Sequence, residues 1–141
     1  MDRQGFQDWL DRYVAAWKSY DPNEIGALFS EDATYQYHPQ DEPERGRAAI
    51  VATWLDDQDE KGTYDAKYEV LAIDGDVHVA QGWSHYFNPD GTKSDDYTNI
   101  YICRFNEAGE CTEFIEYWIQ GREFRKQAID EIKRKAIAGE D

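Results

Sequence analysis

The chain has 141 residues and a formal net charge of −15, from 15 Lys and Arg against 30 Asp and Glu. This is the length of one ordinary domain, and its negative charge disfavours nucleic acid and anionic membrane surfaces as partners. Five Trp, ten Tyr and six Phe exclude a disordered chain, which would be poor in aromatic residues. So many aromatic side chains favour either an amphipathic cavity or a Tyr-rich core with a dimer interface.

The first half of the chain predicts helices before strands. Apolar residues recur at helical spacing from Phe6 to Trp17. Asp21 can cap a second helix, with Pro22 in its first turn and Glu24 completing a capping box. The expected elements after that are a short strand over residues 33–38, a loop over 40–46 and a third helix over about 47–59, fraying at its acidic end.

The second half changes to a period of two and predicts a meander. The expected elements are strands over residues 64–73, 77–87, 95–105 and 111–120, and a last helix over 122–138. Residues 122–141 hold six basic against five acidic residues, whereas residues 1–121 hold nine against 25. We therefore expect one α+β domain over residues 1–141. It is expected to hold three N-terminal helices, a short strand, an antiparallel meander of four strands and a C-terminal helix.

Targeting and redox features are few. No apolar run approaches the roughly 20 residues of a membrane span, and the acidic opening MDRQGFQDWLDRYV is unlike a signal peptide. Cys103 and Cys111 are too few for a disulfide framework and are interpreted as buried thiols. We expect a cytoplasmic protein that binds neither nucleic acid nor membrane.

Three stretches resemble the nuclear transport factor 2-like superfamily, in its SnoaL-like (polyketide cyclase-like) subgroup. They are, in chain order, WKSYDPNEIGALFSEDATYQYHP, RGRAAIVATW and SDDYTNIYICRFNEAGECTEFIEYW. The resemblance implies a cystatin-like fold, in which a curved, cone-shaped sheet, mixed or antiparallel, is wrapped by three N-terminal helices and accompanied by a C-terminal helix. The pocket would lie between the concave face of the sheet and the first and third helices. The resemblance also implies a homodimer. Function stays open, because similar folds serve isomerases, cyclases, dehydratases, epoxide hydrolases and binding domains.

Strand alternation divides the pocket candidates into two faces. On the second meander strand, Gln81, Trp83, His85 and Phe87 share one face and His78, Ala80, Gly82, Ser84 and Tyr86 the other. We expect the concave face to carry Trp83, His85, Tyr97, Asn99 and Tyr101. On the last strand Glu113 and Glu116 both stay open, and the first strand offers Tyr35 with Tyr37 or Gln36 with His38.

His85, Tyr13 and Tyr101 are the catalytic candidates. A histidine suits acid–base work because its unperturbed pKa is about 6.5, and the two tyrosines would donate to a carbonyl or enolate oxygen. SnoaL-like cyclases pair such a histidine with an Asp, but the nearest matches here, Asn99 and Tyr101, are no bases. The alternative is a structural histidine that lines or closes the core. The ligand-binding candidates are Trp17, Tyr35, Tyr37, Trp54, Trp83, Tyr97, Asn99, Glu116 and Trp118.

These residues lead to two hypotheses of function. The first is a pocket for a hydrophobic small molecule, with isomerase, cyclase or lyase chemistry on a carbonyl compound as its catalytic form. The second is a non-catalytic homodimeric binding or assembly module, in which the aromatic side chains fill the cone. No cofactor is expected, and the three histidines lack the paired spacing of metal ligands.

Overall fold

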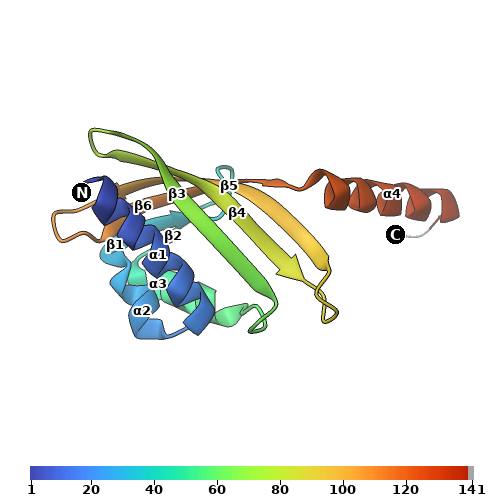
Figure 1. The fold of residues 1–141 in the computed structure, drawn as a ribbon, viewed down its shortest axis with the longest axis horizontal. Coiled ribbons are helices and arrows are strands. Elements are labelled where there is room, and N and C mark those ends of the chain that lie inside the picture. Colours follow the sequence, from blue (N-terminus) through green and yellow to red (C-terminus); the bar gives the residue numbers. More distant parts are fainter. Residues whose placement is uncertain (140–141) are drawn as a thin grey trace.

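The computed structural model describes residues 1–139, and its elements follow the predicted order (Figure 1). The helices are α1 (Arg3–Ser19), α2 (Pro22–Ala27), α3 (Arg47–Asp56) and α4 (Arg122–Ala138). The strands are β1 (Phe29–Gln36), β2 (Glu44–Arg45), β3 (Tyr64–Asp74), β4 (Val77–Phe87), β5 (Lys93–Phe105) and β6 (Cys111–Gln120).

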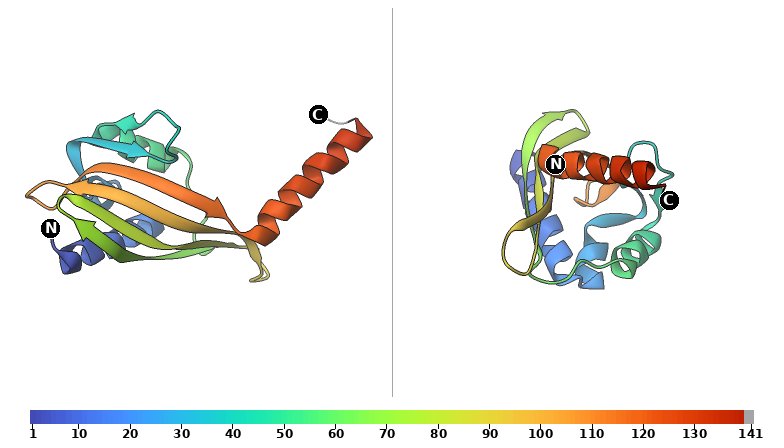
Figure 2. Two further views of the ribbon diagram at one scale, coloured as in Figure 1. Left: turned by 90° about the horizontal axis from the view of Figure 1, so that it is seen from above. Right: turned by 90° about the vertical axis from the view of Figure 1, so that its right-hand side faces the viewer.

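The six strands form one sheet in the order β2-β1-β6-β5-β4-β3. Strands β3 to β6 are an antiparallel meander, whereas β1 pairs parallel with β6, so the sheet is mixed. The sheet curves over α1, α2 and α3, which lie on its concave side (Figures 1 and 2). The predicted α+β class and curved sheet are confirmed.

Three boundaries differ from the sequence prediction. Strand β1 begins at Phe29 instead of residue 33, because Cys111 N donates to Leu28 O and brings β6 alongside at that point. Strand β2 occupies the end of the predicted loop. Helix α3 ends at Asp56, before the acidic run, as expected from the unfavourable position of carboxylates at a helix C-terminus.

The core lies between α1 and the sheet. Phe6, Trp9 and Leu10 of α1 are fully buried, and the Trp9 ring meets Phe29 and Phe105 edge to face. The Trp9 indole N–H donates to Leu28 O at 3.0 Å, so its polar atom is satisfied in the core. This end of the cone is therefore filled.

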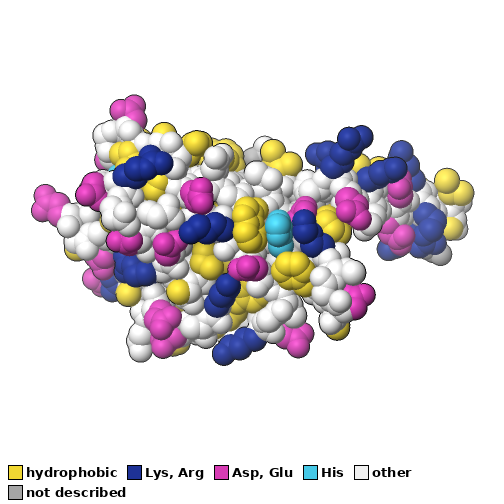
Figure 3. Space-filling model, in the orientation of Figure 1, with side chains coloured by type: hydrophobic (Ala, Val, Ile, Leu, Met, Phe, Trp, Pro, Cys, Tyr) yellow, Lys and Arg dark blue, Asp and Glu magenta, His cyan; other side chains and the backbone are white. Residues whose placement is uncertain are grey.

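Helix α4 stands apart from the rest of the molecule. It follows the end of β6 and points away from the sheet (Figure 2). Helix α4 also contacts β5. Lys and Arg side chains gather on it (Figure 3). Ile129, Ile132 and Ile137 are 45%, 67% and 88% exposed. Within residues 1–139, no helix is long and apolar enough to cross a membrane.

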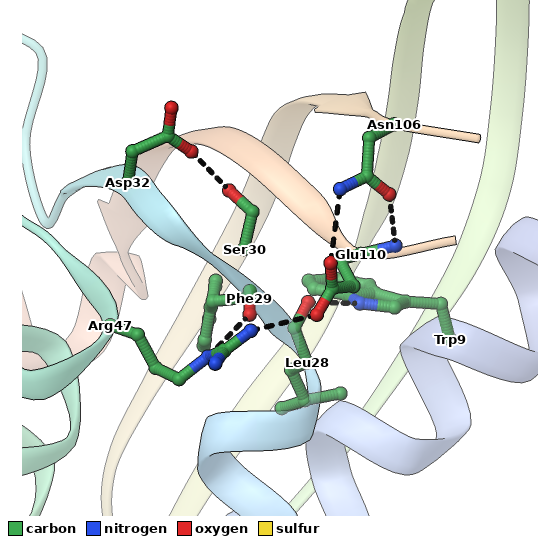
Figure 4. Close-up of polar contacts among 8 residues, drawn as sticks. All are labelled: Trp9, Leu28, Phe29, Ser30, Asp32, Arg47, Asn106 and Glu110. Carbon is green, nitrogen blue, oxygen red and sulfur yellow. Dashed lines mark hydrogen bonds and ion pairs between the residues drawn. The ribbon is translucent and has the colours of Figure 1, made fainter. Parts of the chain in front are cut away.

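Arg47 fixes the start of α3 (Figure 4). Its Nε donates to Phe29 O at 2.9 Å, and its guanidinium pairs with the Glu110 carboxylate at 2.7 Å. Asn106 holds Glu110 in turn, with its Nδ2 3.0 Å from Glu110 Oε1. The resembling stretch RGRAAIVATW thus contributes a structural arginine, which sets how α3 lies against β1 and where Trp54 is presented.

Candidate functional site

A cavity of about 780 Å³ lies between the concave face of the sheet and helices α1 and α3. Its volume is typical of a site for a small molecule. The inner part is lined by buried side chains: Tyr13, Tyr35, Trp54, Tyr68, Ser84, Asn99 and Tyr101. Tyr20 is also buried. The remaining lining residues are half-buried or exposed: Trp17, Tyr37, Thr53, Asp57, Asp59, Tyr86, Ser94, Asp95, Tyr97, Glu116 and Trp118.

Most of the residues proposed from the sequence meet at this cavity. Those that line it are Tyr13, Trp17, Tyr35, Tyr37, Trp54, Tyr97, Asn99, Tyr101, Glu116 and Trp118. The two faces left open are now assigned. On β6 it is Glu116 that faces the cavity, and at the first strand it is Tyr35 of β1 together with Tyr37, which follows the end of β1.

The expected face of β4 is corrected. Ser84 is directly opposite Tyr97 and, with Tyr86, lines the cavity. Successive side chains of a strand alternate between faces, so Trp83 and His85 lie on the outer face. There the two rings stack at 4.3 Å, and the Trp83 side chain is 37% exposed. Ser84 takes the inner position because its hydroxyl bonds two buried cavity groups.

Sequence reasoning missed several lining residues. They are Tyr20, Thr53, Asp57, Asp59, Tyr68, Ser84, Tyr86 and Ser94. Tyr68 carried a usable signal, since it shares a period of two with Tyr64, Ala66 and Val70, all buried on the inner face of β3. Asp57 and Asp59 carried none, because an acidic run after a helix looks like any solvated segment.

A chain of hydrogen bonds runs across the cavity floor to Glu116. Ser84 Oγ donates to Asn99 Oδ1 at 2.8 Å, so the Tyr68 hydroxyl, 2.6 Å away, donates to Ser84. Asn99 Nδ2 then donates to Glu116 Oε2 at 3.3 Å. Every proton in the chain points toward the carboxyl group. The network therefore orients Glu116 and supplies it with one donor.

Glu116 is a carboxyl group balanced between its two protonation states. Burial raises its pKa from 4.5 to about 7, and the bond from Asn99 opposes this rise. No ion pair among residues 1–139 includes Glu116. Near neutral pH such a group can both take and return a proton, which acid–base catalysis requires.

The tyrosines of the cavity floor are neutral donors. The Tyr13 and Tyr35 hydroxyls are 2.5 Å apart. Burial raises the pKa of both, and the nearby Glu116 charge raises it further. The pKa of Tyr101 is raised by the same two causes, burial first. These hydroxyls therefore keep their protons at neutral pH and can donate to an oxygen of a bound molecule.

Trp54 presents an unsatisfied donor. Its side chain lines the cavity from α3 and is only 7% exposed. Among residues 1–139, its Nε1 is the one fully buried side-chain polar atom with no hydrogen-bond partner. A buried N–H without an acceptor is costly. The atom itself has almost no accessible surface, so the ring of Trp54 lines the cavity while its N–H does not open onto it.

Comparison with protein families agrees with this architecture. The model of the SnoaL-like domain matches residues 10–114, which is most of the chain and includes α1 from Leu10 onward, α2, α3 and the sheet as far as Phe114. The chain belongs to the SnoaL-like domain family, and the resemblance to the nuclear transport factor 2-like superfamily is confirmed. No curated protein matches the chain.

Proposed function

We propose that this protein binds a hydrophobic carbonyl compound in the cavity and moves a proton on it, as an isomerase or cyclase does, with Glu116 as the acid–base group. The observation that carries the proposal is the raised pKa of Glu116, about 7, at the end of an oriented hydrogen-bond chain. The acid–base role expected for His85 from the sequence is thus proposed here for Glu116, a carboxyl group on β6.

The chemistry needs one base and one set of donors. The Glu116 carboxylate would take a proton from the carbon next to the carbonyl, so that the C–H bond breaks and a carboxyl O–H forms. The electron pair moves to the carbonyl oxygen as an enolate. Tyr13 and Tyr101 would donate to that oxygen, which stabilises the charge in a site with little water. Return of the proton to another carbon completes an isomerisation and restores the carboxylate.

The test combines binding with proton exchange. A panel of steroid ketones and polyketide-like aromatic ketones is first screened by the shift in melting temperature, since a ligand at 100 times its dissociation constant stabilises by about 2.7 kcal/mol. Each compound that binds is then incubated in D₂O, and deuterium entry next to the carbonyl is followed by NMR. We expect wild-type exchange well above the buffer rate.

Two variants of the same strand make the test specific. Glu116→Gln keeps the shape and the acceptor but cannot take the proton, so we expect exchange to fall by about 100-fold or more. Glu113→Gln removes a carboxylate from the outer face, 3.7 Å from Arg104, and should exchange like wild type. Equal exchange in Glu116→Gln and wild type would refute the catalytic role and leave a binding protein.

We also propose that the protein is a homodimer in which α4 lies on the outer face of a second copy. Two features support this. Helix α4 carries exposed Ile129, Ile132 and Ile137 together with six Lys and Arg, while residues 1–121 carry a net charge of 9 − 25 = −16. The outer face of the sheet, in turn, exposes Trp83, Tyr117 and Ile119. A basic, apolar helix and an acidic body with an apolar face are complementary.

Analytical ultracentrifugation tests the dimer. We expect wild type to sediment as a dimer at micromolar concentration and Ile129→Asp/Ile132→Asp to sediment as a monomer. Gln127→Ala, an exposed change on the same helix that leaves the isoleucines in place, is the control. A monomeric wild type, or a dimer that survives the double change, would contradict the arrangement.

A further inference from the structure

We call the half-buried and exposed part of the lining the mouth of the cavity; it includes Asp57, Asp59 and Asp95 and the rings of Trp17, Tyr86, Tyr97 and Trp118. We infer that the ligand of the cavity is an organic cation, an amine or quaternary ammonium compound whose charged nitrogen lies among the aromatic side chains of this mouth. The inference rests on the proposed function, because it names the class of molecule that the same cavity takes. It is carried by three observations: the composition of the lining, the partners of its carboxylates and the arrangement of its rings.

The cavity lining has one sign of charge. It includes four carboxylates, Asp57, Asp59, Asp95 and Glu116, and, among the described residues, neither Lys nor Arg nor His. The negative charges of a concave site reinforce one another because little water separates them. Such a site attracts cations and repels carboxylates or phosphates.

The mouth carboxylates are bonded only by neutral groups. Asp59 Oδ2 accepts from Trp17 Nε1 at 3.1 Å and from the Tyr20 hydroxyl at 3.4 Å. Asp95 accepts from the Tyr97 hydroxyl at 2.8 Å and from Gln120 Nε2 at 3.0 Å. These bonds hold the carboxylates in place without neutralising them.

Neighbouring carboxylates on the outer face, by contrast, form ion pairs with lysine side chains. Asp96, one residue from Asp95, pairs with Lys93 at 3.1 Å. Asp65 of β3 pairs with Lys18 at 2.8 Å. Within residues 1–139 no such ion pair reaches Asp57, Asp59 or Asp95. The lysine side chains of this region thus lie outside the cavity. A cationic ligand would therefore be the group that neutralises the carboxylates of the mouth.

Four rings of the mouth form what we call the aromatic cage: Trp17, Tyr86, Tyr97 and Trp118. Tyr86 and Tyr97 meet at 88° with ring centres 6.0 Å apart, and Tyr97 and Trp118 meet at 89° with centres 5.5 Å apart. Trp17 stands at 61° to Tyr86. All four rings line the cavity, and the faces of aromatic rings attract ammonium groups.

Hydrogen bonds connect the aromatic cage to the carboxylates of the mouth. Asp59 is bonded to Trp17 and Asp95 to Tyr97, so a charge placed within the cage lies near both. The proposed function places a carbonyl group in the same molecule, so the expected ligand has an ammonium group at one end and a carbonyl oxygen in its apolar remainder.

Three probes of similar size separate charge from hydrophobicity. They are benzyltrimethylammonium, the neutral neopentylbenzene in which carbon replaces the nitrogen, and the anionic 3-phenylpropionate. Calorimetry at low ionic strength should give an affinity about tenfold or more higher for the ammonium compound than for the neutral one. Addition of 0.5 M NaCl should weaken ammonium binding alone, because salt screens the attraction.

A matched pair of double variants locates the effect. Asp57→Asn/Asp59→Asn removes two charges from the lining and keeps acceptors for Trp17 and Tyr20. Asp56→Asn/Glu60→Gln removes two exposed charges from the same segment, neither of which lines the cavity. We expect the first to bind the ammonium probe several-fold more weakly than wild type and the second to bind it as wild type does.

The outcomes distinguish this inference from the proposed function. Equal binding of the ammonium and neutral probes, or preference for the anion, would overturn the cationic ligand while leaving a hydrophobic pocket. Equal loss in the two double variants would also overturn it, since the attraction would then come from the net charge of the whole protein. Binding of no probe, together with no ligand among the ketones, would overturn both.

Discussion

The inner and outer faces of the sheet are built from the same strands, one residue apart, yet they divide polar and apolar groups in an unusual way. Antiparallel sheets commonly hide apolar side chains and expose polar ones. Here the inner face of the sheet holds Ser84, Asn99 and Glu116, while the outer face exposes Trp83 and Tyr117. Removing polar groups from water costs free energy unless they form hydrogen bonds with each other or with a ligand. This division agrees with the site proposed on the inner face and with the dimer contact proposed on the outer face.

Gly82 gives the sharpest contrast between the faces. A Cβ at this position would lie 1.9 Å from Lys67 O and 2.7 Å from Tyr68 Cδ1. Gly82→Ala must therefore push β3 away from β4, and we expect a loss of about 3 kcal/mol or more in the free energy of unfolding. Gln81→Ala, on the outer face beside it, is the control and should change stability by less than about 1 kcal/mol. Chemical denaturation measures both.

Glu116 should make the inner face sensitive to pH. Its pKa is raised by burial, so the folded protein holds the proton more tightly than the unfolded chain. The resulting stability is fully present below about pH 4.5 and is lost as the pH rises through about 7. Glu116→Gln avoids the loss. We expect it to exceed wild type by up to about 3 kcal/mol at pH 8 and to match it at pH 4.5.

Urea unfolding at the two pH values tests this expectation. The control is Glu113→Gln, whose carboxyl group lies on the outer face of the same strand, and it should keep the pH slope of wild type. If Glu116→Gln and wild type lose stability in parallel, the carboxyl group is not desolvated in the way described.

Ser84 tests the hydrogen-bond chain. Ser84→Ala leaves the Tyr68 hydroxyl and Asn99 Oδ1 without their shared partner in a buried site. We expect a loss of about 1–3 kcal/mol in unfolding free energy and a lower exchange rate, because Asn99 no longer holds Glu116 in one orientation. Thr98→Ala on the outer face should leave exchange unchanged. A stable Ser84→Ala protein with wild-type exchange would show that the chain has no positioning role.

His85 should have the smallest effect of the four. The side chain lies on the outer face against Trp83, outside the cavity lining. We expect His85→Ala to stay within about 0.5 kcal/mol of wild type in stability and to bind ligands with unchanged affinity in calorimetry. A tenfold loss of affinity would place the site on the outer face and refute the assignment of faces.

The sequence was sufficient for the fold because each element carries its own local signal. Asp21, for example, caps α2 by accepting from Asn23 N at 2.8 Å, as predicted. Glu24, by contrast, accepts from Ser19 Oγ instead of completing a capping box. Both ends of β4 follow from alternation and from the Asp-Gly and Asn-Pro-Asp-Gly turns that flank it, which need no information from distant parts of the chain.

The site was less predictable because both faces of the sheet carry aromatic side chains. The pattern grouped the residues of β4 correctly, but Trp83 and His85 look as suitable for a pocket as Ser84 and Tyr86. What decides between them is Tyr68, sixteen residues before Ser84, whose hydroxyl needs a buried partner. Such a pairing across strands cannot be inferred from alternation within one strand. The acidic mouth depends on where α3 ends relative to β5, which is also a tertiary fact.

The placement of the tryptophans has an optical consequence. Of the five in the chain, Trp17, Trp54 and Trp118 line the cavity, whereas Trp9 is sealed in the core and Trp83 lies on the outer face. Entry of a molecule changes the surroundings of three emitters and leaves the other two as an internal reference. Tryptophan fluorescence would therefore report the entry of a ligand. Trp83→Phe would remove the emission of the outer face and leave the emission of the cavity tryptophans unchanged.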